Sequence, residues 1–143
     1  MKIINCLILL FFGLSCQNKN ICSEIIYSIA ENHDKSECID LSDWYHSNWD
    51  KIHFISSNLY PDEIEKSTGI KYPYKMHFDP NKVILIEKEG EILYRFCGMC
   101  SDIYFSKKLT KNGIATISSE VSYCLIAKRM PTGHYYLSMK NEF

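Results

Sequence analysis

Apolar and polar positions along the chain predict two helices. Residues 21, 22, 25, 26, 29 and 30 are apolar, and this three- and four-residue spacing predicts one face of a helix that ends near His33. Pro61 suits the first turn of a second helix, with Asp62 and Glu63 favourable at its start and Gly69 at its end. The sequence therefore predicts one longer N-terminal helix and one short helix.

Runs of β-branched and aromatic residues predict about five strands. Residues 51–55 form the first run, and residues 83–86 and 92–96 flank Lys88-Glu89-Gly90-Glu91, a turn in which glycine can adopt positive φ. Residues 121–127 and 134–139 flank a second turn, Met130-Pro131-Thr132-Gly133. We therefore expect an α+β fold with a mainly antiparallel sheet of about five strands.

The N-terminus has the pattern of a targeting segment. Met1-Lys2 gives a positive start, and residues 3–12 are apolar except for Asn5. A run of about ten apolar residues is too short to span a bilayer but suits a secretory signal. The segment Leu14-Ser15-Cys16, followed by polar residues 17–20, resembles the lipobox and tether of bacterial lipoproteins.

That resemblance implies the domain organisation. Residues 1–15 would be a signal peptide, residues 16–20 a tether, and residues 21–143 a single α+β domain. Cys16 would carry a diacylglyceryl group with acyl chains such as palmitate, and would anchor the protein to an envelope membrane, in the periplasm or at the outer surface. Gly13 and Ser15 also form a small-x-small pair, so ordinary cleavage before Cys16, with secretion, is the alternative.

Composition fits one compact domain and excludes several classes. The 143 residues are 46% hydrophobic and 23% charged, with a net charge of -1. Cleavage before Cys16 leaves 128 residues and a charge of -2, because Lys2 is lost. These values exclude a disordered chain and the strongly basic balance of a phosphate-contacting nucleic-acid binder. A chain of this size can fold mainly on its own core.

The seven cysteines have different expected fates. Cys6 leaves with the signal and Cys16 is the expected anchor. Five remain, an odd number: Cys22, Cys38, Cys97, Cys100 and Cys124. Disulfides are permitted in the expected compartment, but their connectivity does not follow from sequence.

One cysteine pair has the spacing of a redox motif. Cys97-Gly98-Met99-Cys100 resembles the motif of thioredoxin-like oxidoreductases, in which a helix N-terminus activates the first thiol. Here the motif follows a hairpin strand, and residues 101–105 make a poor helix start. Gly98-Met99 instead suits a type II′ turn, which would place Cys97 opposite Cys100 within disulfide range. We favour a structural disulfide; redox catalysis, metal binding and unpaired thiols stay open.

Other candidate chemistry is sparse. A zinc site would need two further ligands, and the candidates are scattered without a second paired spacing: Cys22, Cys38, Cys124, His46, His53, His77 and His134. We therefore predict no metal and no cofactor. His53 lies in an apolar strand, which is typical of a partly buried structural histidine. Asp43, Asp50 and Asp79 suit turns or strand edges. No nucleophile elbow or phosphate-binding glycine loop is present, which modestly disfavours an enzyme.

Aromatic residues concentrate in one stretch that we read as loop-rich. The six are Trp44, Tyr45, Trp49, Tyr60, Tyr72 and Tyr74. Tyrosine and tryptophan anchor binding surfaces because they bury a large area with few rotors. The same residues commonly lie in the core or its rim. As a hypothesis, this stretch is a binding face.

The order of motifs from Asp43 onward resembles that of a set of small, uncharacterised bacterial envelope proteins. The matching features are Trp49-Asp50-Lys51 at a strand start, a proline-led acidic helix from Pro61 to Gly69, and an apolar hairpin. The resemblance implies a fold and an envelope setting, and no catalytic residue. We therefore expect a lipid-anchored, non-enzymatic binding module with a protein partner and no nucleic acid, of the inhibitor or immunity type. The alternative is a thiol-disulfide oxidoreductase that uses Cys97 and Cys100.

Overall fold

The computed structural model describes residues 21–32, 37–44, 48–56, 58–74, 83–97, 102–120 and 124–142. Its helices are α1 (Ile21–Asn32), the short 3-10 helices η1 (Leu41–Trp44) and η2 (Lys140–Glu142), and α2 (Pro61–Thr68). Its strands are β1 (Lys51–Ile55), β2 (Val83–Lys88), β3 (Glu91–Cys97), β4 (Ile103–Phe105), β5 (Thr110–Lys111), β6 (Ile114–Ser118), β7 (Leu125–Arg129) and β8 (Tyr135–Met139).

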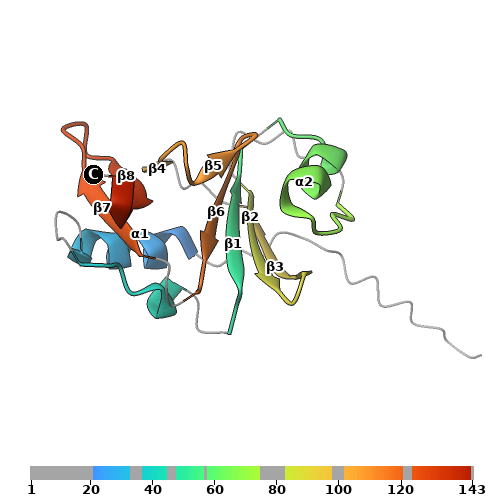
Figure 1. Cartoon of the computed structure of the whole chain (residues 1–143), viewed down its shortest axis with the longest axis horizontal. Coiled ribbons are helices and arrows are strands. Elements are labelled where there is room, and N and C mark those ends of the chain that lie inside the picture. Colours follow the sequence, from blue (N-terminus) through green and yellow to red (C-terminus); the bar gives the residue numbers. More distant parts are fainter. Residues whose placement is uncertain are drawn as a thin grey trace, which may run out of the picture.

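Five strands form the main sheet in the order β3-β2-β1-β6-β5 (Figure 1). All its neighbouring strands pair antiparallel. The central strand β1 places His53 opposite Leu85 of β2 on one side and opposite Thr116 of β6 on the other. Because side chains alternate along a strand, this register brings residues from three strands to the same face.

A second sheet has the order β4-β8-β7. The β7–β8 pair is an antiparallel hairpin, whereas β4 pairs parallel with β8. The hairpin turn closes where Met130 N–H donates to the carbonyl of His134 at 2.7 Å and Gly133 N–H donates to that of Met130 at 2.9 Å. The second sheet therefore joins a local hairpin to β4, which precedes β5 and β6 in the sequence.

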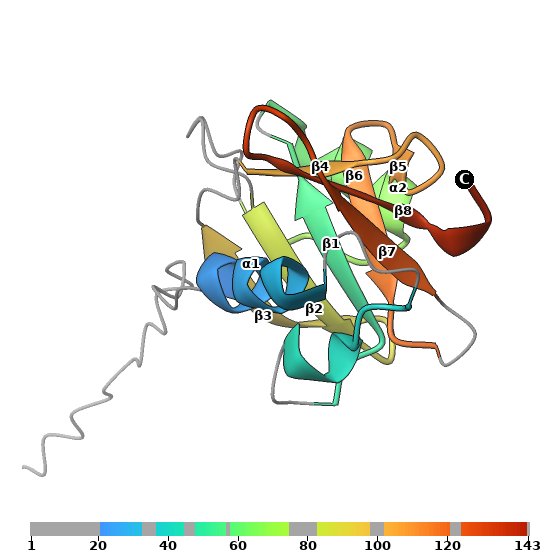
Figure 2. The ribbon, with the colours of Figure 1, turned by 90° about the vertical axis from the view of Figure 1, so that its left-hand side faces the viewer.

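The molecule has three layers. Figures 1 and 2 show α1 and the second sheet side by side over one face of the main sheet, with α2 beyond the other face. The larger core cluster lies in the first interface and includes Ile29 of α1, Phe54 of β1 and Leu137 of β8. A smaller cluster lies on the α2 side and includes Ile64 and Leu85. We call this second side of the main sheet the α2 face.

The α+β class and the five-stranded antiparallel sheet are confirmed. The predicted set of strands was incomplete, because β4, β5 and β6 were missed. Of the strand predicted at residues 121–127, residues 125–127 belong to β7, and residues 121–123 lie outside the described residues. The prediction of a single sheet was therefore wrong. α1 has 12 residues and α2 has 8, so the N-terminal helix exceeds the other by about one turn and neither is long. Neither has the length and apolar character to cross a bilayer.

Local chemistry explains the predicted ends of α2. Tyr60 N–H donates to Glu63 Oε2 at 2.8 Å, which satisfies one backbone donor at the helix start. Gly69 ends the helix in the left-handed region with φ 76°, and its N–H donates to the carbonyl of Glu65. The predicted proline start and glycine stop are therefore confirmed.

Candidate functional site

A buried polar row crosses the α2 face of the main sheet. His53 Nε2 lies 2.6 Å from Glu87 Oε2, and its Nδ1 lies 2.9 Å from Thr116 Oγ1. His53 and Glu87 are both buried, and Lys51 Nζ lies 3.6 Å from the second Glu87 oxygen. The row therefore joins β2, β1 and β6 through side chains as well as through the backbone.

Burial decides the protonation state of His53. Desolvation is the largest influence and lowers the pKa of the imidazole below its usual 6.5, against the opposing effect of the Glu87 hydrogen bond. A neutral ring that donates from Nε2 to Glu87 accepts from the Thr116 hydroxyl at Nδ1. Because only 2% of His53 is exposed, a substrate has no access to it. The prediction of a satisfied structural histidine is confirmed.

Asp50 has a structural position at the start of β1. Its Oδ2 accepts from the Glu89 N–H at 2.7 Å, and its Oδ1 lies 3.0 Å from Lys88 Nζ. The Glu89 backbone hydrogen bond, followed by the Lys88 bond, lowers the pKa of this carboxyl. The carboxylate therefore holds the β2–β3 turn, as its predicted turn role requires. Asp79 lies outside the described residues, as does the side chain of Asp43.

Three of the six predicted surface aromatics lie in the core. Trp44 and Trp49 belong to the larger core cluster, and Tyr72 belongs to the smaller one. Trp44 donates from Nε1 to Ser28 Oγ at 3.2 Å and packs edge-on against Phe54. The two clusters lie on opposite faces of the main sheet, so the six residues do not form one surface. Burial of large apolar area explains the placement.

The other three aromatics are spread over different surroundings. Tyr74 is partly buried and stacks with Arg95, whose Cζ lies 4.4 Å from the ring centre. Tyr60 is 56% exposed at the start of α2. Tyr45 lies outside the described residues. Of the five described aromatics, Tyr60 alone has the exposure of a contact residue.

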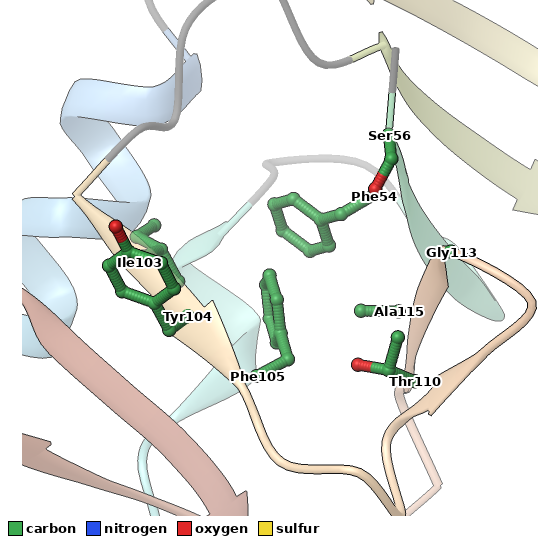
Figure 3. A pocket seen from close by; sticks show the side chains of 8 residues that line it. All are labelled: Phe54, Ser56, Ile103, Tyr104, Phe105, Thr110, Gly113 and Ala115. Carbon is green, nitrogen blue, oxygen red and sulfur yellow. The ribbon is translucent and has the colours of Figure 1, made fainter. Parts of the chain in front are cut away.

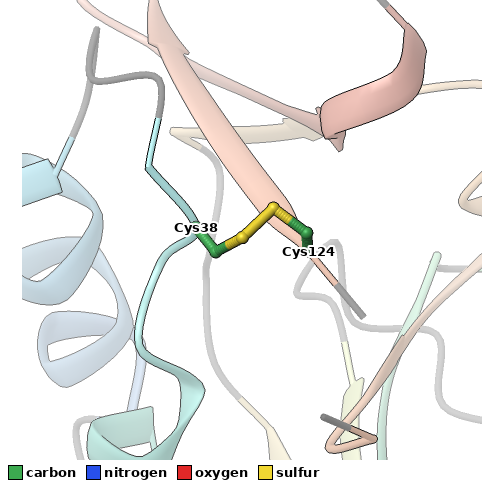
Figure 4. The surroundings of a disulfide bond; sticks show 2 residues. All are labelled: Cys38 and Cys124. Atoms are coloured by element: carbon green, nitrogen blue, oxygen red, sulfur yellow. A yellow bond between two sulfur atoms is a disulfide. The ribbon is translucent and has the colours of Figure 1, made fainter. Parts of the chain in front are cut away.

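The structure pairs Cys38 with Cys124 in a disulfide (Figure 4). The flanking backbone supports the link, because Ile39 N–H donates to the carbonyl of Leu125 at 2.8 Å. The bond ties the segment before η1 to the start of β7. Cys97 ends β3, but its side chain and the whole of Cys100 lie outside the described residues, so their predicted pairing stays a prediction. Cys22 is in α1, and its side chain is likewise not described.

A small cavity of about 120 Å³ lies between the two sheets (Figure 3). Phe105 points from β4 toward Phe54 of β1, with ring centres 4.7 Å apart, and Ala115 lines the floor. These walls are mostly apolar, and the lining residues that carry a hydroxyl are Ser56, Tyr104 and Thr110. The cavity is a packing gap between the two sheets, and none of its described lining residues carries a carboxylate, imidazole, thiol or amine.

A larger open groove of about 350 Å³ lies on the second sheet. Its lining residues are Tyr104, Met130, Thr132, His134 and Tyr136. Tyr104 is directly opposite Tyr136 in the parallel β4–β8 pair, and Tyr136 is opposite Lys128 in the hairpin. The neighbours Ile103, Leu137 and Ala127 are buried, so the Tyr104, Tyr136 and Lys128 side chains emerge on the opposite side. We call this side the outer face of the second sheet.

The groove combines exposed apolar surface with a few polar groups. Tyr104 is 50% exposed and Met130 is 42% exposed. The His134 ring lies edge-on to Tyr104, with ring centres 5.3 Å apart at 85°. His134 Nδ1 also lies 3.3 Å from Asp102 Oδ1, in a contact without hydrogen-bond geometry. This chemistry suits binding, because aromatic rings supply area and the polar rim supplies orientation.

Sequence reasoning missed this groove. Its tyrosines come from β8, which was predicted, and from β4, which was missed because residues 103–105 are too short a run to stand out. The parallel pairing that brings Tyr104 beside Tyr136 joins residues 32 positions apart. A usable signal was alternation in residues 134–138, where His134 and Tyr136 share one side of the strand.

The described residues define a three-layer α+β protein with two sheets, one disulfide and an aromatic groove. In those residues, no group of three or more His, Cys, Asp or Glu side chains is placed to hold a metal ion. Comparisons with known proteins found no protein family, no curated protein and no solved structure that matches this chain. The proposal for its function therefore rests on the chain itself.

Proposed function

We propose that the protein is a lipid-anchored binding module of the cell envelope, of the inhibitor or immunity type, which contacts a protein partner. The observation that carries the binding role is the outer face of the second sheet, where Tyr104 and Met130 are about half exposed and line a groove. An exposed aromatic and thioether surface in a small domain favours association, because covering it removes apolar area from water. This face replaces the aromatic stretch suggested by the sequence.

The location rests on the N-terminal pattern. The apolar residues 3–12 and the lipobox-like Cys16 favour export and acylation. The Cys38–Cys124 disulfide gives weaker support, because such bonds persist mainly in oxidising compartments. The absence of a motif for nucleophilic or metal catalysis in the sequence favours binding over chemistry.

Site-specific photo-crosslinking tests the binding role. A photoreactive phenylalanine replaces Tyr104 in the intact cell, and the matched control places it at Tyr60, which is similarly exposed but adjoins α2. We expect a discrete protein adduct from position 104 and none of the same mass from position 60. The Met130→Ala change should weaken the adduct at 104. Irradiation that gives no adduct at 104, or the same adduct at both positions, would contradict the proposal.

A further inference from the structure

The groove on the second sheet has the form of a site for an extended chain. Its volume of about 350 Å³ is open to solvent along the outer face, between the β7–β8 turn and β4. Small-molecule pockets usually enclose most of their ligand, and this one does not. A groove of this kind suits a segment that enters and leaves along the surface.

The walls suit a chain that makes its contacts through side chains and carbonyls. Tyr104 and Tyr136 present two rings from directly opposed positions of β4 and β8. His134 stands edge-on to Tyr104, and Thr132 adds a hydroxyl at the rim. Because these groups lie on the face of a sheet, the ligand does not need to extend the backbone ladder.

Polyproline II is the conformation that fits these requirements. It has three residues per turn and no internal hydrogen bonds, so its carbonyls are open to donors and its rings can pack on aromatic walls. Proline also fixes φ, so less entropy is lost on binding. Aromatic-lined grooves on small β-domains recognise such segments by this combination.

Charge at the rim adds a preference for the flanking residue. The Asp102 side chain is 57% exposed beside the groove and lies next to His134. Lys128 of the outer face lies on β7 opposite Tyr136, whereas Asp102 immediately precedes β4. At the β4 end, a basic residue adjoining the prolines would therefore meet the Asp102 carboxylate, whereas an acidic one would be repelled. We propose that the groove binds a proline-rich segment of the protein partner in the polyproline II conformation, with a basic residue beside Asp102. This inference rests on the proposed binding function.

Fluorescence anisotropy with synthetic peptides tests the inference. The protein is purified in detergent as the cell processes it, and three labelled probes are compared: decaproline with a terminal arginine, the same peptide with a terminal glutamate, and a glycine-serine peptide of equal length. We expect saturable binding of the arginine probe, weaker binding of the glutamate probe and none of the flexible probe. Equal binding of all three, or no saturable binding, would overturn the inference.

Matched variants locate the contact. Tyr104→Ala should lower the affinity for the arginine probe about tenfold, because truncating an aromatic anchor commonly has an effect of that size. Tyr60→Ala removes an equally exposed ring at α2 and should leave the affinity unchanged. Asp102→Asn should remove the preference for arginine over glutamate. A Tyr60→Ala effect as large as that of Tyr104→Ala would overturn the inference.

Two further readouts keep the outcomes distinct. Tyr104→Thr keeps a strand-favouring residue if the alanine variant unfolds, and Tyr104→Phe keeps the ring and should retain binding. A cross-linked partner at position 104 that contains no proline-rich segment would overturn this inference and leave the binding function standing. The absence of any adduct at 104 would contradict the function itself.

Discussion

At the scale of single residues, His53 shows how the main sheet accommodates a polar side chain in its interior. Both ring nitrogens have partners, on the strands at either side of β1. A buried polar group that is fully paired costs little, whereas an unpaired one costs about 1–3 kcal/mol. The sequence could place His53 in a strand but could not identify Glu87 and Thr116 as its partners, because they lie 34 and 63 residues away.

The lowered pKa of His53 predicts a pH dependence of stability. In the unfolded chain, His53 takes up a proton as pH falls through about 6.5. In the folded protein, the buried ring takes up that proton only at a lower pH. Between these two pKa values, the unfolded state therefore holds more protons than the folded state. The contribution of His53 is present in full above about pH 6.5 and is lost as pH falls through the lower folded pKa. Urea unfolding at pH 5, 6, 7 and 8 should therefore show a falling free energy of unfolding toward acid.

The control for this prediction is His53→Gln. Glutamine keeps hydrogen-bonding capacity but does not titrate, so its unfolding free energy should vary less between pH 7 and pH 5 than that of the parent. All other residues are the same in both proteins, so their contributions cancel in the comparison. An identical pH profile for the two proteins would show that His53 is not the responsible group.

Arg95 gives a second prediction at this scale. Its guanidinium packs on Tyr74 and, at 5.9 Å, on Tyr72, but its Nε is buried without a hydrogen-bond partner. A cation–π contact contributes about 0.5–1 kcal/mol at such sites, whereas a buried unpaired donor costs about 1–3 kcal/mol. Arg95→Met keeps an apolar stem and removes the donor, so thermal unfolding should show equal or higher stability. A melting temperature several degrees lower would contradict this balance.

At the scale of elements, the strands that sequence analysis missed are those that complete both sheets. β6 pairs with the central strand β1 across about 60 residues of chain, and no local pattern encodes that partner. A local signal for its hairpin did exist. Asn112 and Gly113 have φ values of 50° and 80° and join β5 to β6, and an Asn-Gly pair is a strong hairpin signal. The β2–β3 turn at Gly90 was predicted because its glycine can also adopt positive φ.

The disulfide is the covalent counterpart of these long-range pairings. Cys38 and Cys124 are 86 residues apart, so the bond closes a loop that contains α2 and strands β1 to β6. Restricting so long a loop in the unfolded chain stabilises the fold by about 2–5 kcal/mol. The sequence indicated that disulfides were permitted, but it did not indicate which cysteines pair.

Removal of the bond should lower stability measurably. The double variant Cys38→Ser/Cys124→Ser should lose about 2–5 kcal/mol of unfolding free energy in urea titration, with the secondary structure of the folded state unchanged. Ser28→Ala is a suitable comparison, because it removes the hydroxyl that accepts the Trp44 hydrogen bond at 3.2 Å without touching a covalent link, and it should cost about 1 kcal/mol. Equal stability of the double variant and the parent would show that the bond does not constrain the unfolded chain.

At the scale of the whole molecule, three layers place α1 and the second sheet on one face of the main sheet and α2 beyond the other. α1 covers the main sheet beside the second sheet, while the groove opens on the side of the second sheet that faces away from the larger core cluster. The apolar pattern of the sequence predicts that such layers exist, but it does not predict their arrangement. The sequence predicted an α+β domain, but which helix lies beside which sheet depends on contacts between distant residues such as Ile29 and Leu137.

The proposed anchor gives the prediction at this scale. Two or more acyl chains hold a protein stably on a membrane, whereas one is marginal. The parent should therefore partition into the detergent phase of a Triton X-114 extract, and Cys16→Ser should move to the aqueous phase or stay unprocessed. Intact mass spectrometry reports the acyl mass directly. An aqueous parent protein whose mature N-terminus is an unmodified Cys16 would favour simple secretion.

The position of the Cys38–Cys124 bond also has a mechanical consequence. A force applied between the proposed tether and the β7–β8 hairpin would pass along the chain through α1 to Cys38 and cross the disulfide into β7. The five strands of the main sheet belong to the bypassed loop and carry none of that load. A partner that pulls on this hairpin would therefore load the Cys38–Cys124 bond. The backbone hydrogen bonds of the main sheet would stay intact.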